Sequence, residues 1–200
     1  MTKELEIEFK NMLTQSEYEG LLAHFGCKAG EAETQQNYYF DTPDFQLKEK
    51  KCALRIRRKG EAFECTLKTP APEGNYEITD SLPSIQAWEM IDGKSFHSPE
   101  VEAALAGLQV DPAKLHMIGK LTTHRTELEI EGGLLVLDHS EYGEKEDFEV
   151  EFEVAEAVAG KARFLSLLQS HAIPVRPADK KIARFMAAAK EQAARKTEAD

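Results

Sequence analysis

Glutamate alternates with apolar residues in two short segments that lie far apart in the sequence. Residues 4–10 read E-L-E-I-E-F-K, and residues 148–154 read F-E-V-E-F-E-V. A period of two indicates a β-strand, because successive side chains leave a pleated backbone on opposite faces. Each strand would therefore have one apolar and one acidic face. Such carboxylates are ligands that hard cations such as Mg²⁺ prefer, although a solvated face of an antiparallel sheet gives the same pattern.

Basic residues follow the same alternation in the segments between these two. Residues 51–59 put Arg55 and Arg57 on one face, and residues 62–68 continue the pattern after Gly60-Glu61, a pair that suits a tight hairpin turn. Further along, residues 121–130 put Arg125, Glu127 and Glu129 on one face, and a turn at Gly132-Gly133 leads to another strand that ends at Asp138. Acids and bases thus recur on one face of strand after strand.

A closed barrel would let all these charged faces point inward while helices cover the apolar outside. The acids would then bind cations, and the bases would neutralise a highly charged anion. Arginine suits this task because its planar guanidinium binds two phosphate oxygens at once. A metal-chelated polyphosphate is the guest that such an interior fits best.

The order and spacing of these motifs resemble the CYTH superfamily, whose members are also called triphosphate tunnel metalloenzymes. The resemblance covers roughly residues 4–190 and is closest to the small bacterial members known as YjbK-like triphosphatases. The matching elements are, in chain order, Glu6-Ile7-Glu8-Phe9-Lys10, Tyr38-Tyr39-Phe40-Asp41-Thr42, Arg55-Ile56-Arg57, Thr66-Leu67-Lys68, Arg125, Asp138, Glu149-Val150-Glu151 and Lys181.

The resemblance implies an α+β fold, a closed or nearly closed antiparallel eight-stranded β-barrel with helices packed outside. It also implies a hydrolase of triphosphate compounds that depends on Mg²⁺ or Mn²⁺, with inorganic triphosphate as the first expected substrate. A class IV-type adenylate cyclase and a thiamine triphosphatase would use the same residues, so both stay open. A module that binds polyphosphate or a nucleotide without turning it over is a further alternative.

Residue roles carry over from the family motifs position by position. The expected metal ligands lie on the two acidic strands, and which two of the last three bind metal is left open: Glu6, Glu8, Glu149, Glu151 and Glu153. The expected substrate-binding residues are Lys10, Arg55, Arg57, Lys68, Arg125 and Lys181. Glu6, Glu8, Lys10 and Asp138 are the expected catalytic residues, whereas Glu64 and Glu77 could face inward with or without contacting a ligand.

Composition favours one cytoplasmic domain, which we expect over residues 1–194, with a frayed tail at residues 195–200. The net charge of −11 argues against a nucleic-acid surface, which should be basic. No apolar run is long enough for a membrane span and no hydrophobic N-terminal segment is visible, so we expect neither a membrane partner nor secretion. Cys52 and Cys65 fall on the apolar face of their hairpin and should be packing residues. The sequence leaves the oligomeric state open.

Apolar residues at helical spacing predict helices outside the barrel. The expected helices are Ser16–Phe25, Pro83–Ile91, Pro99–Leu108, Ala162–His171 and Asp179 to about Arg195. His124 and His139 alternate onto the apolar side of their strands and should be packed or hydrogen-bonded. An adenine or thiamine ring would need an aromatic platform, for which Tyr38, Tyr39 and Trp88 are the candidates.

Overall fold

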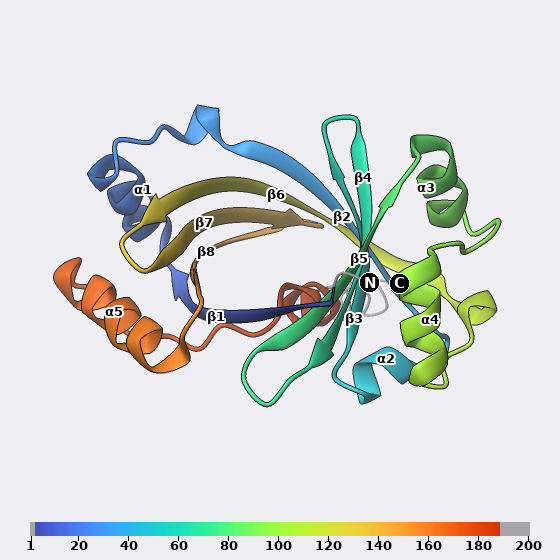
Figure 1. Cartoon of the computed structure of the whole chain (residues 1–200). Helices are drawn as coiled ribbons and strands as arrows, with labels where there is room; N and C mark the ends of the chain where they lie inside the picture. Colours follow the sequence, from blue (N-terminus) through green and yellow to red (C-terminus); the bar gives the residue numbers. More distant parts are fainter. Residues whose placement is uncertain (1–2, 189–200) are drawn as a thin grey trace, which may run out of the picture. The chain divides into compact units, whose positions relative to one another are not determined.

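The fold comprises eight strands with helices between and after them, as seen in a computed structural model that describes residues 3–188. The expected tail at residues 195–200 lies outside the described residues. The strands are β1 (Lys3–Leu13), β2 (Glu33–Asp41), β3 (Ala53–Lys59), β4 (Ala62–Pro70), β5 (Asn75–Leu82), β6 (His116–Ile130), β7 (Gly133–Tyr142) and β8 (Lys145–Val154) (Figure 1). The helices are α1 (Gln15–His24), α2 (Gln46–Glu49), α3 (Ser84–Ile91), α4 (Pro99–Gly107) and α5 (Ala157–Ser170), and residues 181–188 are also helical.

The strands close into one barrel in the order β1-β5-β4-β3-β2-β6-β7-β8, which confirms the predicted fold class. Every pairing given in register is antiparallel. Closely contacting residues form two compact units, which are described separately below. Among the described residues, the first unit holds residues 3–7 and Thr34–Lys120, and the second holds Glu8–Glu33 and residues 121–188.

In the first unit, the outer faces of the strands pack on α3 and α4. Ile56, Leu67 and Ile78 come from three adjacent strands and are at most 4% exposed. Cys52 and Cys65 belong to the same hydrophobic cluster, as their alternation predicts. The hairpin between β3 and β4 turns at Gly60, whose φ of +55° is a conformation that glycine adopts without steric cost.

Two aspartates, one at the end of β2 and one in β5, fix the starts of α2 and α4. The carboxylate of Asp41, at the end of β2, accepts hydrogen bonds from the backbone N–H groups of Thr42, Leu47 and Lys48 at 2.8, 2.9 and 3.1 Å. Asp80 of β5 accepts in the same way from Glu100 and Val101 at the start of α4, at 3.0 and 3.1 Å. The Y-F-D-T motif is therefore explained locally, because its aspartate satisfies backbone donors that would otherwise be buried without partners.

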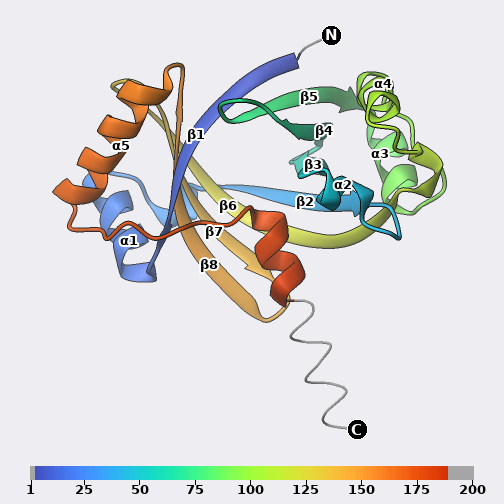
Figure 2. The same ribbon diagram turned by 90° about the horizontal axis from the view of Figure 1, so that it is seen from below.

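In the second unit, β7 and β8 pack their outer faces against α1 and α5 (Figure 2). Leu137, Val150 and Phe152 are at most 1% exposed and form the centre of this second hydrophobic cluster. Helix α5 begins at Ala157, five residues before the predicted start at Ala162. The earlier start follows from the side chain of Glu156, which caps the helix by accepting from Val158 N and Ala159 N.

A network around β1 holds the segment that leads into the last helical residues. The buried Asn11 side chain donates to the carbonyl of Pro174 at 3.1 Å and accepts from the backbone N–H of Arg176 at 2.6 Å. The Arg176 guanidinium in turn donates to both carboxylate oxygens of Glu17 at 2.7 and 2.9 Å. These contacts fix where residues 181–188 start within the second unit.

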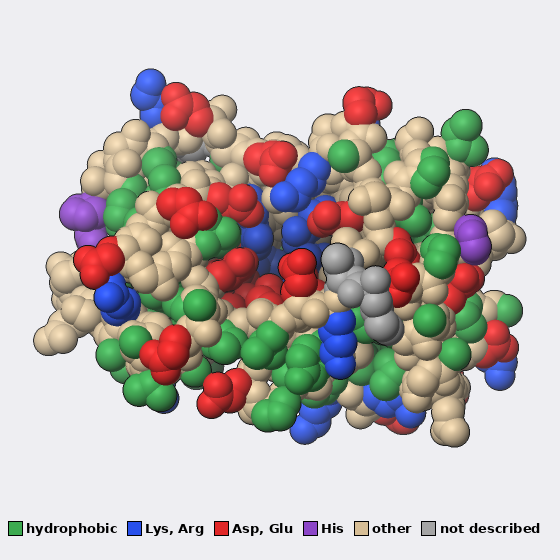
Figure 3. All heavy atoms as spheres, in the orientation of Figure 1, with side chains coloured by type: hydrophobic (Ala, Val, Ile, Leu, Met, Phe, Trp, Pro, Cys, Tyr) green, Lys and Arg blue, Asp and Glu red, His purple; other side chains and the backbone are tan. Residues whose placement is uncertain are grey.

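Acidic, basic and apolar side chains are mixed over the face drawn in Figure 3. Among residues 3–188, no helix combines the length and the apolar character that a bilayer crossing requires.

The ion pair between Glu17 and Arg176 predicts a specific acid sensitivity. Hydrogen bonds from Arg176 lower the pKa of Glu17 from 4.5 to about 2. A pKa that is lower in the folded state stabilises the fold above the unfolded-state pKa, and this contribution is lost as the pH falls from 4.5 toward about 2. In Glu17→Gln, the amide keeps the helix-capping interaction with Thr14 but loses the charge. We expect this variant to be less stable than the wild type at neutral pH, with a difference that narrows below about pH 4.5.

Urea unfolding at a series of pH values between about 7 and 3 measures this difference. A gap between the two proteins that stays constant over this range would contradict the assignment.

Candidate functional site

Three buried carboxylates meet on the inner face of the second unit, opposite to its hydrophobic cluster. Asp138 of β7 pairs directly with Glu149 of β8, and Glu151 is the next residue of β8 on the same face. The three side chains are between 0 and 5% exposed, and one oxygen of each lies within 4.8 Å of the others. We call these residues the acid triad.

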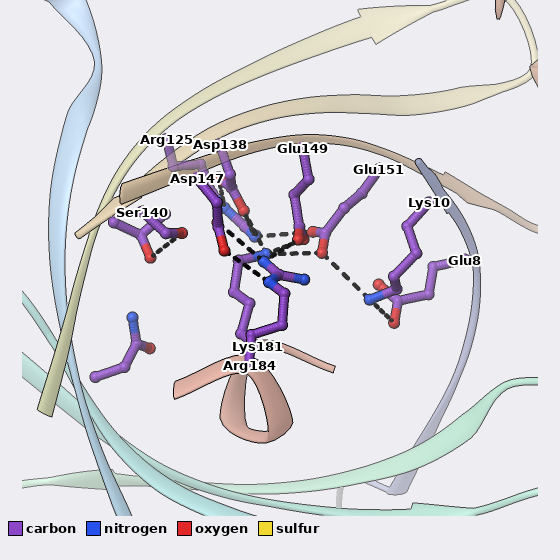
Figure 4. Close-up of polar contacts among 12 residues, drawn as sticks. Glu8, Lys10, Arg125, Asp138, Ser140, Asp147, Glu149, Glu151, Lys181 and Arg184 are labelled. Carbon is purple, nitrogen blue, oxygen red and sulfur yellow. Dashed lines mark hydrogen bonds and ion pairs between the residues drawn. The ribbon is translucent and has the colours of Figure 1, made fainter. Parts of the chain in front are cut away.

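Lys181 and Arg125 each contact more than one carboxylate of the acid triad. The ammonium of Lys181, from the last helical segment, lies among the three carboxylates, 2.8 Å from Asp138, 2.9 Å from Glu151 and in contact with Glu149 (Figure 4). The Arg125 guanidinium donates to both oxygens of Asp138 at 2.8 and 2.6 Å, and to Glu151 at 2.9 Å. Arg125 is positioned by the register of β6 and β7, which pairs it directly with Asp138.

A further ion pair lies at the start of β8. Arg184, one helical turn after Lys181, contacts Glu149 and donates to Asp147 at 2.8 and 3.2 Å. The Tyr142 hydroxyl donates to the same Asp147 carboxylate at 2.5 Å. Lys181 and Arg184 therefore approach β8 from one side of the helical segment and contact successive inward positions of that strand.

On the β1 side, Lys10 links the acid triad to Glu8. The Lys10 ammonium lies 2.8 Å from Glu8 and 3.3 Å from Glu151. Glu8 and Lys10 are two residues apart on β1, so both side chains point to the same face, as the alternating pattern predicts. This contact brings one predicted metal ligand and one predicted phosphate ligand to the edge of the triad.

Burial and neighbouring charges act on the pKa values of the triad in opposite directions. Burial, with Glu151 beside it, raises the pKa of Glu149 to about 7 in spite of the cations that contact it. For Asp138, burial also acts upward, but Arg125 and Lys181 outweigh it and lower the pKa. Lys181 and Lys10 keep the pKa of Glu151 well below its ordinary value, although burial opposes this. Glu149 is thus the triad member that ionises least readily.

The first unit carries its own set of charges on the inner face. Lys68 donates to both oxygens of Glu6 at 2.8 and 2.6 Å and lies 2.5 Å from Glu77. Arg57 donates to the Asn37 side chain at 3.0 Å and lies 3.6 Å from Glu64. Glu64 and Glu77, which the sequence left open, therefore contact the predicted phosphate ligands of this unit.

Arg55 differs from these basic residues because its Nε is buried and has no hydrogen-bond partner among the described residues. It is paired across the strands with Tyr39 and Thr66, so its side chain belongs to the inner face of the first unit. A buried donor without a partner costs about 1–3 kcal/mol. An anion that accepts from Arg55 would remove this cost.

The donor chemistry of the acid triad fits a hard divalent cation. Mg²⁺ and Mn²⁺ prefer carboxylate oxygens, and the Lys181 ammonium shows that a cation is accommodated among these three. Of the predicted metal ligands, Glu149 and Glu151 lie in the triad, and Glu8 lies beside it through Lys10. Glu6 belongs to the first unit, and Glu153 is not part of the triad.

Two of the three aromatic candidates for a ring-binding platform lie on the outer face. Tyr38 is 5% exposed within the hydrophobic cluster of the first unit, and Trp88 of α3 packs edge-on against it and against Phe63. Tyr38 therefore does not face inward as a platform would require, because position 38 of β2 alternates toward the helices, and Trp88 belongs to one of these outer helices. Tyr39 points to the same face as Arg55 and stays a candidate.

The sequence interpretation missed Arg184 and Asp147. Arg184 stands three residues after Lys181, so in a helix both project from the same side. Asp147 stands two residues before Glu149, so in a strand both point to the same face. Both spacings were visible in the sequence, and each places a further charged residue beside a predicted one.

The buried contact between Arg125 and Asp138 predicts a large effect on stability. Removing one partner of a buried ion pair leaves the other charge uncompensated and costs about 3–5 kcal/mol. We therefore expect Arg125→Met to lower the free energy of unfolding by about this amount, and Arg125→Met/Asp138→Asn to recover part of it.

Urea unfolding of the three proteins measures these differences. The matched control is Arg163→Met, because the partner of Arg163 is the 89% exposed Glu131 and surface pairs contribute about 0–1 kcal/mol. An effect of Arg125→Met no larger than that of the control would contradict a structural role for this pair.

Comparisons with known proteins agree with the motifs and the barrel. The sequence model of the CYTH domain matches residues 4–186. The chain is 44% identical to a Bacillus subtilis protein named "Putative triphosphatase YjbK" over 187 residues, which cover 92% of this chain and 96% of that protein.

Solved structures give the same result. A Bacillus halodurans protein named as a "putative adenylate cyclase" has a TM-score of 0.89 at 38% identity, with coverage of 92% of this chain and 99% of that chain. A Hippeastrum protein, described as a "putative adenylyl cyclase" with a dominant triphosphatase activity, shares the fold with a TM-score of 0.77 at 24% identity, over 92% of this chain and 96% of that chain. The motif order, the closed barrel and these matches together show that the chain belongs to the CYTH family.

Proposed function

We propose that this protein is a divalent-metal-dependent phosphohydrolase of triphosphate compounds, with inorganic triphosphate as the first candidate substrate. The observation that carries the proposal is the acid triad, whose buried carboxylates are in direct contact with Lys181 and Arg125. Oxygen donors for a metal ion and bases for phosphate oxygens on one sheet face are what a metal-chelated polyphosphate requires.

The metal ion is held by Asp138, Glu149 and Glu151 in this proposal, and Glu8 extends the ligand set. The family motif also makes Glu6 a metal ligand. Geometry favours Glu149 and Glu151 over Glu153, since only the first two belong to the triad. When bound, Mg²⁺ or Mn²⁺ supplies Lewis-acid polarisation of a phosphoryl oxygen and lowers the pKa of a coordinated water.

The basic residues bind the phosphate oxygens. In the second unit these are Lys10, Arg125 and Lys181, and in the first unit they are Arg55, Arg57 and Lys68. The unpartnered Nε of Arg55 supports this role most directly, because a phosphate oxygen would give it the acceptor it lacks. Phosphoryl transfer needs little covalent work from a protein, so charge neutralisation and positioning by these residues account for most of the catalysis.

Asp138 acts as a positioning residue for the cations as well as a metal ligand. Both of its oxygens accept from Arg125, and Oδ2 also lies 2.8 Å from Lys181. The planar guanidinium is therefore held in one orientation, which leaves its remaining N–H groups directed at other acceptors.

The names of two relatives point to different reactions on triphosphates. The Bacillus subtilis relative carries a triphosphatase name and the Bacillus halodurans relative an adenylate cyclase name. The outward position of Tyr38 and its ring contact with Trp88 favour hydrolysis of a substrate without a ring, because they leave Tyr39 as the one remaining member of the predicted platform. We propose a small-molecule triphosphate as the partner and the cytoplasm as the location, with no nucleic-acid or membrane partner.

A phosphate-release panel tests the proposed reaction. Inorganic triphosphate, ATP and thiamine triphosphate are each incubated with Mg²⁺, Mn²⁺ or a chelator, and cyclic AMP is measured in parallel. We expect phosphate release from inorganic triphosphate with a metal ion and none with the chelator. Turnover in the chelator would remove the metal role, cyclic AMP would indicate a cyclase, and binding without any turnover would indicate a binding module.

The unpartnered Nε of Arg55 predicts the effect of Arg55→Ala. A hydrogen bond to a charged group contributes about 1.5–3 kcal/mol, so the loss of this contact should raise KM for triphosphate about 10- to 100-fold. We expect little change in the melting temperature, because Nε has no protein partner to lose.

Arg58→Ala is the matched control from the same strand. Arg58 points to the opposite face of β3, where it contacts Gly60, Glu61 and the ring of Trp88. The KM of the Arg58→Ala variant for triphosphate should stay at the wild-type value. Equal KM values for the two variants would exclude Arg55 from phosphate binding.

A further inference from the structure

Two histidines and two glutamates cluster on the outer face of β6, β7 and β8. His124 and His139 are paired directly across β6 and β7, and their ring centroids are 5.5 Å apart. Glu141 follows His139 by two residues on the same face, and its carboxylate lies 3.6 Å from Nε2 of His124. One donor atom each of His124, His139 and Glu141 lies within 4.8 Å of the other two. We call these three residues and Glu146 the outer histidine cluster.

Packing holds His139 in place within this cluster. Its ring stacks on Phe148 with centroids 4.5 Å apart and an interplanar angle of 15°, and Tyr18 lies against it at 6.4 Å. Nε2 of His139 is also 2.8 Å from the carboxylate of Glu146. A ligand side chain that neighbours already orient loses less freedom when a metal binds, which favours affinity.

Both histidines are partly buried, whereas the glutamates are open to solvent. The side chains of His124 and His139 are 32% and 23% exposed, and those of Glu141 and Glu146 are 53% and 56% exposed. The cluster is therefore open to solvent on the side of its carboxylates. The carboxylates also supply negative charge beside the two imidazoles.

From this geometry we propose that His124, His139 and Glu141 form a second metal site, which binds a borderline transition-metal cation such as Zn²⁺. Imidazole nitrogen together with carboxylate oxygen is a ligand set that Zn²⁺ accepts at four-coordinate sites. The Glu146 carboxylate is the candidate for the fourth ligand. The hard ions Mg²⁺ and Mn²⁺ prefer oxygen, so the acid triad and the outer histidine cluster should select different metals.

The two sites use opposite faces of the same strand. Asp138 points inward to Arg125, and the next residue, His139, points outward to Phe148. Zinc binding at the outer cluster is therefore independent of whether the acid triad catalyses hydrolysis, and a failure of one proposal leaves the other intact.

Calorimetric titration with Zn²⁺ in excess Mg²⁺ tests this site, because Mg²⁺ competes at the oxygen-rich triad but not at imidazole. We expect one Zn²⁺ per chain. Loss of a residue that only supports a metal ligand typically weakens binding about 10- to 100-fold, so His124→Ala and Glu141→Gln, which remove ligands, should each weaken Zn²⁺ binding at least about tenfold. Glu141 is exposed, so this variant should fold normally even if a histidine variant does not.

The rival histidine pair of the second unit provides the control. His24 and His171 have ring centroids 4.4 Å apart, and no carboxylate joins them in a metal-ligand group among the described residues. His24→Ala/His171→Ala should keep wild-type Zn²⁺ affinity, and Zn²⁺ should shift the imidazole NMR signals of His124 and His139. Unchanged affinity in Glu141→Gln and His124→Ala, shifts confined to His24 and His171, or no Zn²⁺ binding would each overturn the proposal.

Discussion

The arrangement of the site depends on how the buried charge of the acid triad is neutralised. Moving an ionised carboxylate out of water costs several kcal/mol, and this cost is recovered only by well-placed opposite charges and hydrogen bonds. Arg125 provides them from within the sheet, whereas Lys181 and Arg184 provide them from the last helical segment. That segment must therefore be fixed accurately, and this explains why the fully buried Asn11 binds the chain at Pro174 and Arg176.

The charges at this site do not balance if every group is ionised. Acidic residues outnumber basic residues in the ion-pair network around Lys10, Arg125, Lys181 and Arg184 (Figure 4). A pKa of about 7 at Glu149 fits this excess of acidic groups, because a proton on that carboxylate removes one negative charge. The proton on Glu149 and the ammonium of Lys181 together carry two positive charges, as one Mg²⁺ or Mn²⁺ ion does. If one divalent cation replaced the proton on Glu149 and the ammonium of Lys181, the net charge of the site would thus stay the same.

The strand faces could be predicted from sequence because a period of two depends only on local geometry. This is why Glu8, Lys10, Arg125 and Glu149 were assigned correctly to polar faces. Closure of the barrel did not follow from alternation, which is equally compatible with an open sheet, and its prediction rested on the resemblance to the CYTH family. Contacts such as Lys68 with Glu6 require the order of the strands, which no local pattern contains.

Arg184 shows a different limit of the sequence interpretation. Its position in a helix was expected, but which side of that helix faces the sheet depends on contacts made by Asn11 and Arg176, more than 160 residues apart in the chain. Tyr38 was misplaced for a related reason. Its motif was read as the end of a strand. Which of Tyr38 and Tyr39 faces inward depends on the pairing of β2 with β3, which places Tyr39 opposite Arg55.

One register fixes both faces of β7, and hence both proposed metal sites. A shift of one residue would turn every side chain of the strand to the other face. Asp138 would then leave the acid triad, and His139 would leave the outer histidine cluster. Gly133 at the start of β7 opposes such a shift, because a Cβ there would come within 2.1 Å of the carbonyl oxygen of Glu153. The same close approach that aligns Asp138 with Glu149 also aligns His139 with Phe148. A residue larger than glycine at position 133 would therefore disturb the inner and the outer cluster together, although it contacts neither.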